Sequence, residues 1–211
     1  HGSVSRMARP RRGVAAIVAA VLIGAAIWRF WPAPSAARAP VIPATADTLL
    51  VHLPFRGEVL NSSASGAATL VTAGNLLPVR DRHGREDEAY QFSGLSKVEL
   101  ALAPSARPDS GTPLTTAAWF RSTVDDEHGR ALIVAQSSEG GTFGFGLSLA
   151  RRRLVFGLGP SGDEASVALR AESQIELKKW HHAAAVFDGL EVAVFLDGRE
   201  AGRMRYSGKK A

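Results

Sequence analysis

The stretch Trp180-His181-His182-Ala183-Ala184-Ala185-Val186-Phe187-Asp188-Gly189 is followed two residues later by Val192-Ala193-Val194-Phe195-Leu196-Asp197-Gly198. Two apolar runs that each end in Asp-Gly predict antiparallel strands joined by tight turns, because glycine readily takes the positive φ of such turns. The paired histidines and the two aspartates also suggest a metal-binding or catalytic cluster. Adjacent side chains of a strand point to opposite faces, however, so His181 and His182 cannot hold one metal ion together. We therefore expect one histidine in the core and both aspartates in turns.

The same pattern of short apolar runs and Gly-, Ser- or Asp-rich turns extends over the chain from Asp47 onward, and no window keeps helical spacing for three turns. It predicts an all-β domain, a two-sheet antiparallel jelly-roll sandwich, in which Trp119 and Trp180 lie in the core. The expected strands are Leu49–Phe55, Ala89–Phe92, Lys97–Leu102, Thr115–Ser122, Ala131–Gln136, Phe143–Leu149, Leu154–Leu158, Ser166–Ala171, Trp180–Phe187 and Glu191–Leu196.

The N-terminal part of the chain has a different character. Residues 1–12 are basic, and residues 13–28 carry no charge and are followed by Arg29-Phe30-Trp31. A basic flank before an apolar run that ends in aromatic residues predicts one transmembrane helix over residues 13–31, with its N-terminus in the cytoplasm. An uncleaved signal segment is the alternative, because the run is shorter than a typical span. Residues 32–46 form an Ala/Pro-rich linker, and residues 47–211 form the jelly-roll domain, which we expect on the extracytoplasmic, periplasmic or cell-surface side of the membrane.

The charge distribution excludes nucleic acid as a partner. Six of the 25 basic residues lie in residues 1–44, which contain no acidic residue, so 19 basic residues face 20 acidic ones in the remainder. A near-neutral domain lacks the excess of positive charge that proteins use to bind a phosphate backbone.

A family resemblance follows from the order of several motifs. Leu53-Pro54-Phe55 through Asn61-Ser62-Ser63 comes first, then Glu88 to Gly94, then Leu114 to Phe120, then the two stretches that end in Asp-Gly. This order resembles that of laminin-G-like, concanavalin A-like jelly-roll domains. The resemblance implies two curved antiparallel sheets and a binding role rather than catalysis. It also implies a final strand with an acidic residue, so the sequence, which stops at Ala211, predicts a degenerate or C-terminally truncated strand.

The resemblance further implies a calcium site made from loop oxygens. The position after the first strand is commonly aspartate in such domains, and here it is Asn61. A neutral amide lowers the ligand charge, so a weak site at Asn61 and Asp188 is the expectation.

The leading hypothesis is a membrane-anchored, non-catalytic module that binds carbohydrate or protein outside the cytoplasm. Loops rather than strands should carry its contacts, because they can vary without disturbing the core. Two alternatives stay open: a glycoside hydrolase that uses Glu86 and Glu88, and a structural envelope domain without a small ligand. The candidate contacts are the polar loop and turn residues Arg82, His83, Asp125, Asp126, Arg151, Arg152 and Arg153.

Overall fold

The computed structural model describes residues 16–22, 49–93, 96–109, 111–123, 130–136, 144–159 and 167–206. The prediction of an all-β fold is confirmed there, since the described elements are strands and one three-residue 3-10 helix. The elements are β1 (Ala16–Leu22), β2 (His52–Leu53), β3 (Ala68–Ala73), β4 (Leu77–Val79), β5 (Ala89–Ser93), β6 (Val98–Leu102), η2 (Pro104–Ala106), β7 (Leu114–Ser122), β8 (Arg130–Gln136), β9 (Gly144–Ala150), β10 (Arg153–Gly159), β11 (Val167–Arg170), β12 (His181–Phe187), β13 (Glu191–Leu196) and β14 (Arg199–Arg205).

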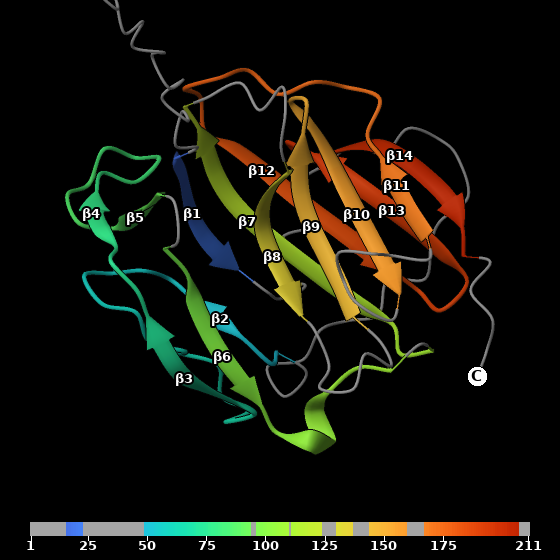
Figure 1. The fold of residues 1–211 in the computed structure, drawn as a ribbon, viewed down its shortest axis with the longest axis horizontal. Helices are drawn as coiled ribbons and strands as arrows, with labels where there is room; N and C mark the ends of the chain where they lie inside the picture. The colour runs from blue at the N-terminus through green and yellow to red at the C-terminus, as the bar shows by residue number, and fades with distance from the viewer. Residues whose placement is uncertain are drawn as a thin grey trace, which may run out of the picture.

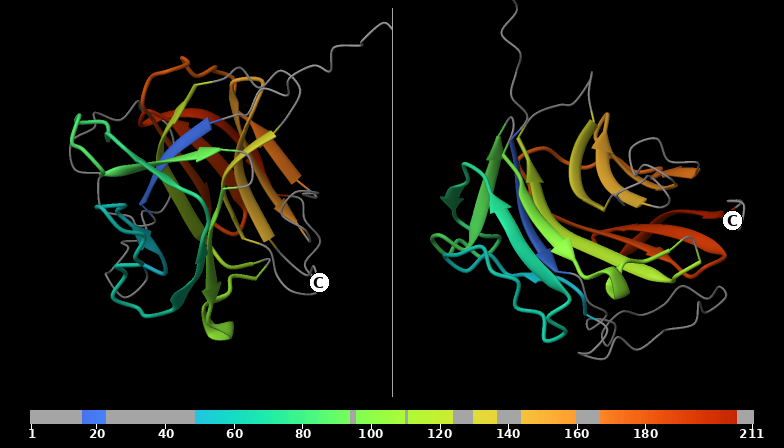
Figure 2. Two further views of the ribbon diagram at one scale, coloured as in Figure 1. Left: turned by 60° about the vertical axis from the view of Figure 1, so that its left-hand side comes forward. Right: turned by 60° about the horizontal axis from the view of Figure 1, so that its bottom comes forward.

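The strands form two main layers. The large sheet has the order β14-β13-β12-β7-β1-β5-β4, with β2 paired to β1, and the smaller sheet has the order β11-β10-β9-β8. Figure 1 shows the smaller sheet lying across one face of the large sheet, and the right-hand view of Figure 2 shows the two as separate layers. Every pairing described is antiparallel, and β3 and β6 form a further two-stranded ribbon. The fold is therefore the sandwich that the sequence predicts.

The core lies between the layers, and β12 illustrates how the sequence builds it. Its residues alternate between buried and half-buried, with His181, Ala183, Ala185 and Phe187 directed inward. The small sheet contributes large apolar side chains, Phe156 among them, to the same cluster. A strand with one apolar face against a second sheet is stabilised mainly by that burial, at about 25 cal/mol per Å² of apolar surface.

The hairpin after β13 follows the prediction from the Asp-Gly signal. Asp197 and Gly198 are the two residues between β13 and β14, with φ of 51° and 79°. Positive φ at both central positions matches the right-handed twist of the flanking strands. This turn fixes where the Asp197 carboxylate lies relative to β12.

The expectation of a transmembrane helix over residues 13–31 is not supported. Of that segment the structure describes Ala16–Leu22, which form strand β1 between β5 and β7. An uninterrupted apolar run is compatible both with a central strand of a sheet and with a membrane helix. The periodicity of the sequence therefore cannot distinguish a strand from a helix here. No helix within the described residues has the length and apolar character of a membrane span.

Strands β3, β4 and β14 are absent from the sequence prediction. Strand β14 is polar and contains Gly202, and β4 contains Pro78, so neither shows an apolar alternation. Both pair with a neighbour along the chain, β14 with β13 and β4 with β5, and Pro78 is tolerated because β4 is the last strand of its sheet.

Candidate functional site

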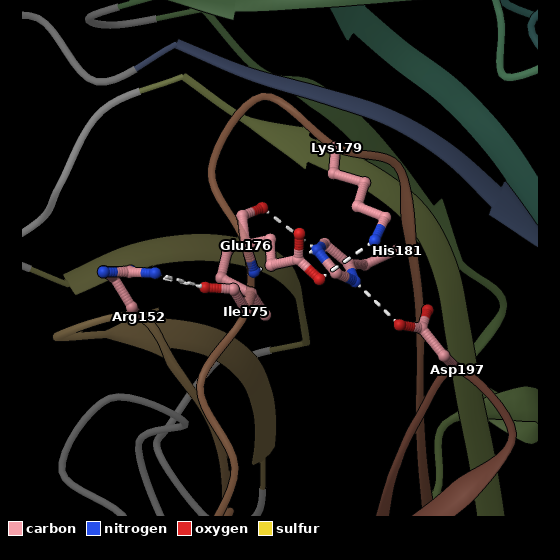
Figure 3. Close-up of polar contacts among 6 residues, drawn as sticks. All are labelled: Arg152, Ile175, Glu176, Lys179, His181 and Asp197. Carbon is pink, nitrogen blue, oxygen red and sulfur yellow. Dashed lines mark hydrogen bonds and ion pairs between the residues drawn. The ribbon is translucent and has the colours of Figure 1, made fainter.

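The opening histidines lie on opposite faces of β12, as predicted. His181 is buried, and its Nδ1 lies 2.8 Å from Oδ2 of Asp197. Its Nε2 lies 3.1 Å from the backbone nitrogen and 3.0 Å from the carbonyl oxygen of Glu176 (Figure 3). The second Asp197 oxygen accepts the backbone N–H of His182 at 2.8 Å. Both ring nitrogens of His181 are thus used within the protein, so this histidine holds strands together and is not offered to a ligand.

The basic turn between β9 and β10 belongs to the same structural region. Arg152 donates from Nη2 to the carbonyl oxygen of Ile175 at 2.9 Å (Figure 3), and Arg153 donates to the carbonyl oxygens of Ala171 and Glu172. These guanidinium groups hold the segment that leads to β12. Arg151 is exposed, and no interaction of its side chain is found among the described residues.

The other face of the large sheet carries partly exposed aromatic side chains. Trp119 lies opposite His182 across β7 and β12, with ring centroids 5.1 Å apart. The guanidinium carbon of Arg82 lies 4.5 Å from the centroid of the Trp119 ring. Trp119 and Trp180 were predicted as core residues, but both are only partly buried; Trp119 packs against the core cluster without being enclosed by it. Phe120, the neighbour of Trp119, takes the core position instead and is fully buried.

His182 is a neutral side chain on this face of the sheet. Burial lowers its pKa, and the nearby Arg82 charge lowers it further, while Asp197 acts in the opposite direction. The net direction is downward, so the imidazole is neutral at pH 7. It packs against Trp119 and adds no charge of its own.

Arg82 also lines a shallow pocket beside the edge strand β4, which we call the edge depression. Its volume of about 100 Å³ is well below the roughly 300–1,000 Å³ of pockets that hold a whole small molecule. It can therefore accept one small group of a ligand. The lining residues come from β2 and the segment after it, and from the loop between β4 and β5: His52, Pro54, Arg56, Asp81, Arg82, Arg85 and Glu88.

Local backbone geometry brings the two segments together. Phe55 has a φ of 55°, which sends its ring into the core against Tyr90 and leaves Arg56 exposed. The backbone N–H of Gly57 donates to the carbonyl oxygen of Asp87 at 2.9 Å and ties this segment to the loop between β4 and β5. The depression is thus built on residues anchored in the core.

Asp81 organises the loop. Its Oδ1 accepts the backbone N–H groups of His83 and Arg85, and its Oδ2 accepts Nε and Nη2 of Arg85 at 2.9 and 2.6 Å. Burial alone would raise the pKa of Asp81, but the hydrogen bonds from Arg85 and His83 and the Arg85 charge outweigh it and lower the pKa to about 2. The carboxylate is ionised, and both of its oxygens accept hydrogen bonds that stabilise the conformation of the loop between β4 and β5.

The two glutamates that could form a hydrolytic pair are each bound to a different arginine. Glu86 pairs with Arg80, and Glu88 lies 3.1 Å from Arg85. Each carboxylate is therefore engaged in an ion pair with its own arginine.

The residues predicted to bind calcium are used by turns. Asn61 Oδ1 accepts the N–H groups of His52 and Ser63, and its Nδ2 donates to Ala68. Asp188 Oδ1 accepts the N–H groups of Leu190 and Glu191. Within the described part of the chain, no three His, Cys, Asp or Glu side chains are grouped so that they could hold a metal ion. The Oδ1 atoms of both residues are therefore engaged by backbone N–H groups.

Of the predicted contacts, only Arg82 lies in the depression. His83 is exposed in the same loop but does not line it, and Asp125 and Asp126 lie outside the described residues. His52, Arg56 and Arg85 were not among the residues predicted as contacts, although Arg56 lies in the first motif of the family resemblance and Arg85 lies in the loop of Arg82 and His83. Only the tertiary structure shows that these residues line one depression.

Comparison with known proteins gives one family. The model of the concanavalin A-like lectin/glucanases superfamily, of laminin G type, matches residues 96–211, which are more than half of the chain. No curated protein and no solved structure matches the chain.

The Asp197 carboxylate should contribute strongly to stability. Replacing it by alanine leaves the buried Nδ1 of His181 without an acceptor, which costs about 2 kcal/mol of unfolding free energy. Urea unfolding of Asp197→Ala measures this loss. Glu172→Ala, which removes the same charge from an exposed side chain, is the control, and an equal unfolding midpoint for the two variants would contradict the assigned role.

The Asp81 loop should make stability depend on pH in the acid range. The pKa of Asp81 is about 2 in the folded protein against an ordinary 3.8, so its contribution is complete above about pH 4 and disappears as the pH falls toward 2. Asp81→Asn should therefore lower the unfolding free energy by about 2 kcal/mol at pH 7, less where water screens Arg85, and by clearly less at pH 3. Unfolding curves at both pH values test this, with Glu172→Gln as the charge control; a pH-independent difference would refute it.

Proposed function

Because this chain belongs to the concanavalin A-like lectin/glucanase superfamily, we propose that it is a non-catalytic recognition module that binds carbohydrate. The family description names both lectins and glucanases, so membership alone leaves the choice between binding and hydrolysis open. The choice made here rests on the side chains around the edge depression.

The observation that carries the proposal is the contact of Arg82, which lines the depression, with Trp119: the guanidinium carbon lies 4.5 Å from the centroid of the indole ring. A sugar presents hydroxyl groups at its edges and C–H groups on its faces. A guanidinium plane supported by an indole ring offers donors at its edges and a weakly hydrated flat face, which match both parts of a sugar. Arg82 is the proposed contact residue, and Trp119 is the residue that positions it.

The environment of the acidic residues supports binding without turnover. A glycosidase needs one carboxylic acid that is protonated and a second carboxylate opposite it. Glu86 and Glu88 are each paired with an arginine, and Asp81 is occupied by four hydrogen bonds. The lowered pKa of Asp81 keeps that carboxylate ionised, and the two glutamates are each engaged in an ion pair.

We extend the proposal to location: the domain lies outside the cytoplasm, and residues 13–31 anchor it in the membrane. The support is the basic N-terminal flank and the uncharged run that follows it. Such anchoring and the pairing of Ala16–Leu22 with β7 exclude each other in one molecule, because the same residues cannot lie in the bilayer and in the sheet.

A cysteine pair distinguishes the two placements, since the chain contains no cysteine. Val21 and Ala118 are partners across β1 and β7, and partner Cα atoms of antiparallel strands lie within disulfide range. Val21→Cys with Ala118→Cys should form a disulfide in the purified, lipid-free chain and stay reduced in cell membranes treated with the same oxidant. Val18→Cys with Ala118→Cys, which are out of register, is the control. A disulfide in the membrane fraction would contradict anchoring.

Saccharide binding is tested with the full chain on an array of neutral and acidic oligosaccharides, followed by titration calorimetry on the strongest ligand. Arg82→Ala should weaken binding at least tenfold. Trp119→Ala should weaken it as well, while Trp119→Phe should keep part of the affinity because the phenyl ring still supports the guanidinium. Unfolding midpoints show whether each variant is folded.

Two results would contradict the proposal. Binding to no saccharide would favour a structural domain. Release of reducing sugar by the chain, lost in a Glu86→Gln, Glu88→Gln double variant, would identify an enzyme.

A further inference from the structure

Three arginines face the edge depression, and two of them have no acidic partner in the described part of the chain. Arg56 and Arg82 are both exposed and form none of the ion pairs found among these residues. Arg85, in contrast, shares its guanidinium between Asp81 and Glu88. Two arginine side chains beside one small hollow, each without a neutralising carboxylate, create a local positive potential.

The acidic residues of the depression do not cancel this potential. The lining carries three positive charges, on Arg56, Arg82 and Arg85, and two negative charges, on Asp81 and Glu88, with His52 neutral. Arg85 is paired with both carboxylates, which leaves Arg56 and Arg82 without an ion-pair partner among these residues. The domain as a whole has nearly equal numbers of basic and acidic residues, so a local excess of positive charge stands out. Asp81 is buried and Glu88 is half-buried, whereas Arg56 and Arg82 are exposed, so both arginines without an acidic partner are accessible to an anion.

His52 contributes a neutral, polar wall. Its Nδ1 lies 2.8 Å from Oγ of Ser62, and burial, followed by the Arg56 charge, lowers its pKa. The imidazole is therefore uncharged at pH 7 and can take part in hydrogen bonds with hydroxyl groups next to an anionic substituent.

Arg82 has an aromatic partner that restricts its side chain. Its guanidinium carbon lies 4.5 Å from the centroid of the Trp119 ring, a cation–π contact. A guanidinium presents a planar fork of donors that binds carboxylate or sulfate oxygens in a bidentate manner, and a side chain restricted by such a contact loses less entropy on binding than a mobile arginine. The hollow of about 100 Å³ accepts one such group while the remainder of the ligand lies outside it.

We propose that the edge depression binds the carboxylate or sulfate group of an acidic saccharide, with Arg56 and Arg82 as the contacts. This inference rests on the proposed function and narrows it from carbohydrate in general to acidic carbohydrate. The recognised unit is the anionic substituent, and the sugar ring lies against Arg82 and the polar wall at His52.

The test compares matched ligands on the full chain by titration calorimetry. The probes are a hyaluronan hexasaccharide, which carries carboxylates, a chondroitin sulfate hexasaccharide, a neutral chitin hexasaccharide, and vesicles containing one third anionic phospholipid. Wild-type protein should bind the two acidic hexasaccharides at least tenfold more tightly than the neutral one at low ionic strength, and added salt should reduce the difference.

The variants locate the site. Arg56→Gln with Arg82→Gln should abolish the preference for acidic ligands, whereas Arg170→Gln with Arg199→Gln, which removes two exposed arginines elsewhere, should retain it. Single variants at positions 56 and 82 replace the double variant if it does not fold.

Each outcome has a defined meaning. Equal affinity for neutral and acidic hexasaccharides, an unchanged preference in the Arg56→Gln, Arg82→Gln variant, or binding to the anionic vesicles alone would overturn the inference. The first of these results leaves the proposed carbohydrate binding intact. Binding to none of the saccharides would overturn both.

Discussion

The hydrogen bond between the buried His181 ring and the Asp197 carboxylate connects the core of the sandwich to its outer surface. One oxygen of Asp197 lies 2.8 Å from Nδ1 of the buried His181, and the other accepts the backbone N–H of His182. The carboxylate can serve both because Asp197 occupies a turn position with positive φ directly after β13. A turn between β13 and β14 therefore determines how β12 sits beside it.

This arrangement separates the two faces of β7 and β12. His181 and Phe120 lie inward with ring centroids 6.0 Å apart, and His182 and Trp119 lie outward with centroids 5.1 Å apart. Slipping the register of β12 by one residue would exchange the two pairs and place a tryptophan and a polar ring in the core. Because Trp119 supports Arg82, the position of the proposed contact residue depends on the register that the buried pair holds.

Much of the fold could be predicted from the sequence, because it depends on short-range signals. The apolar runs of β12 and β13, the Asp-Gly turn at Asp197 and the inward and outward histidines are all local patterns. The strand at Ala16–Leu22 was missed because an apolar run fits a central strand and a membrane helix equally well. The error at Trp119 has a different cause: hydrophobicity indicates that a side chain avoids water, but not on which face its strand presents it. Arg56 and Arg82 line the same depression because the fold brings together two segments about 25 residues apart, and no sequence spacing predicts this.

The tautomer of His181 tests the account most directly. A long-range ¹H–¹⁵N correlation spectrum of the folded chain at pH 7 reports which ring nitrogen carries a proton. The account predicts a proton on Nδ1, because the Asp197 carboxylate 2.8 Å away accepts it, with Nε2 facing the backbone of Glu176. A neutral ring protonated only on Nε2 would place a bare nitrogen lone pair against the carboxylate, and would contradict the claim that this pair sets the register of β12 and the face on which the binding surface lies.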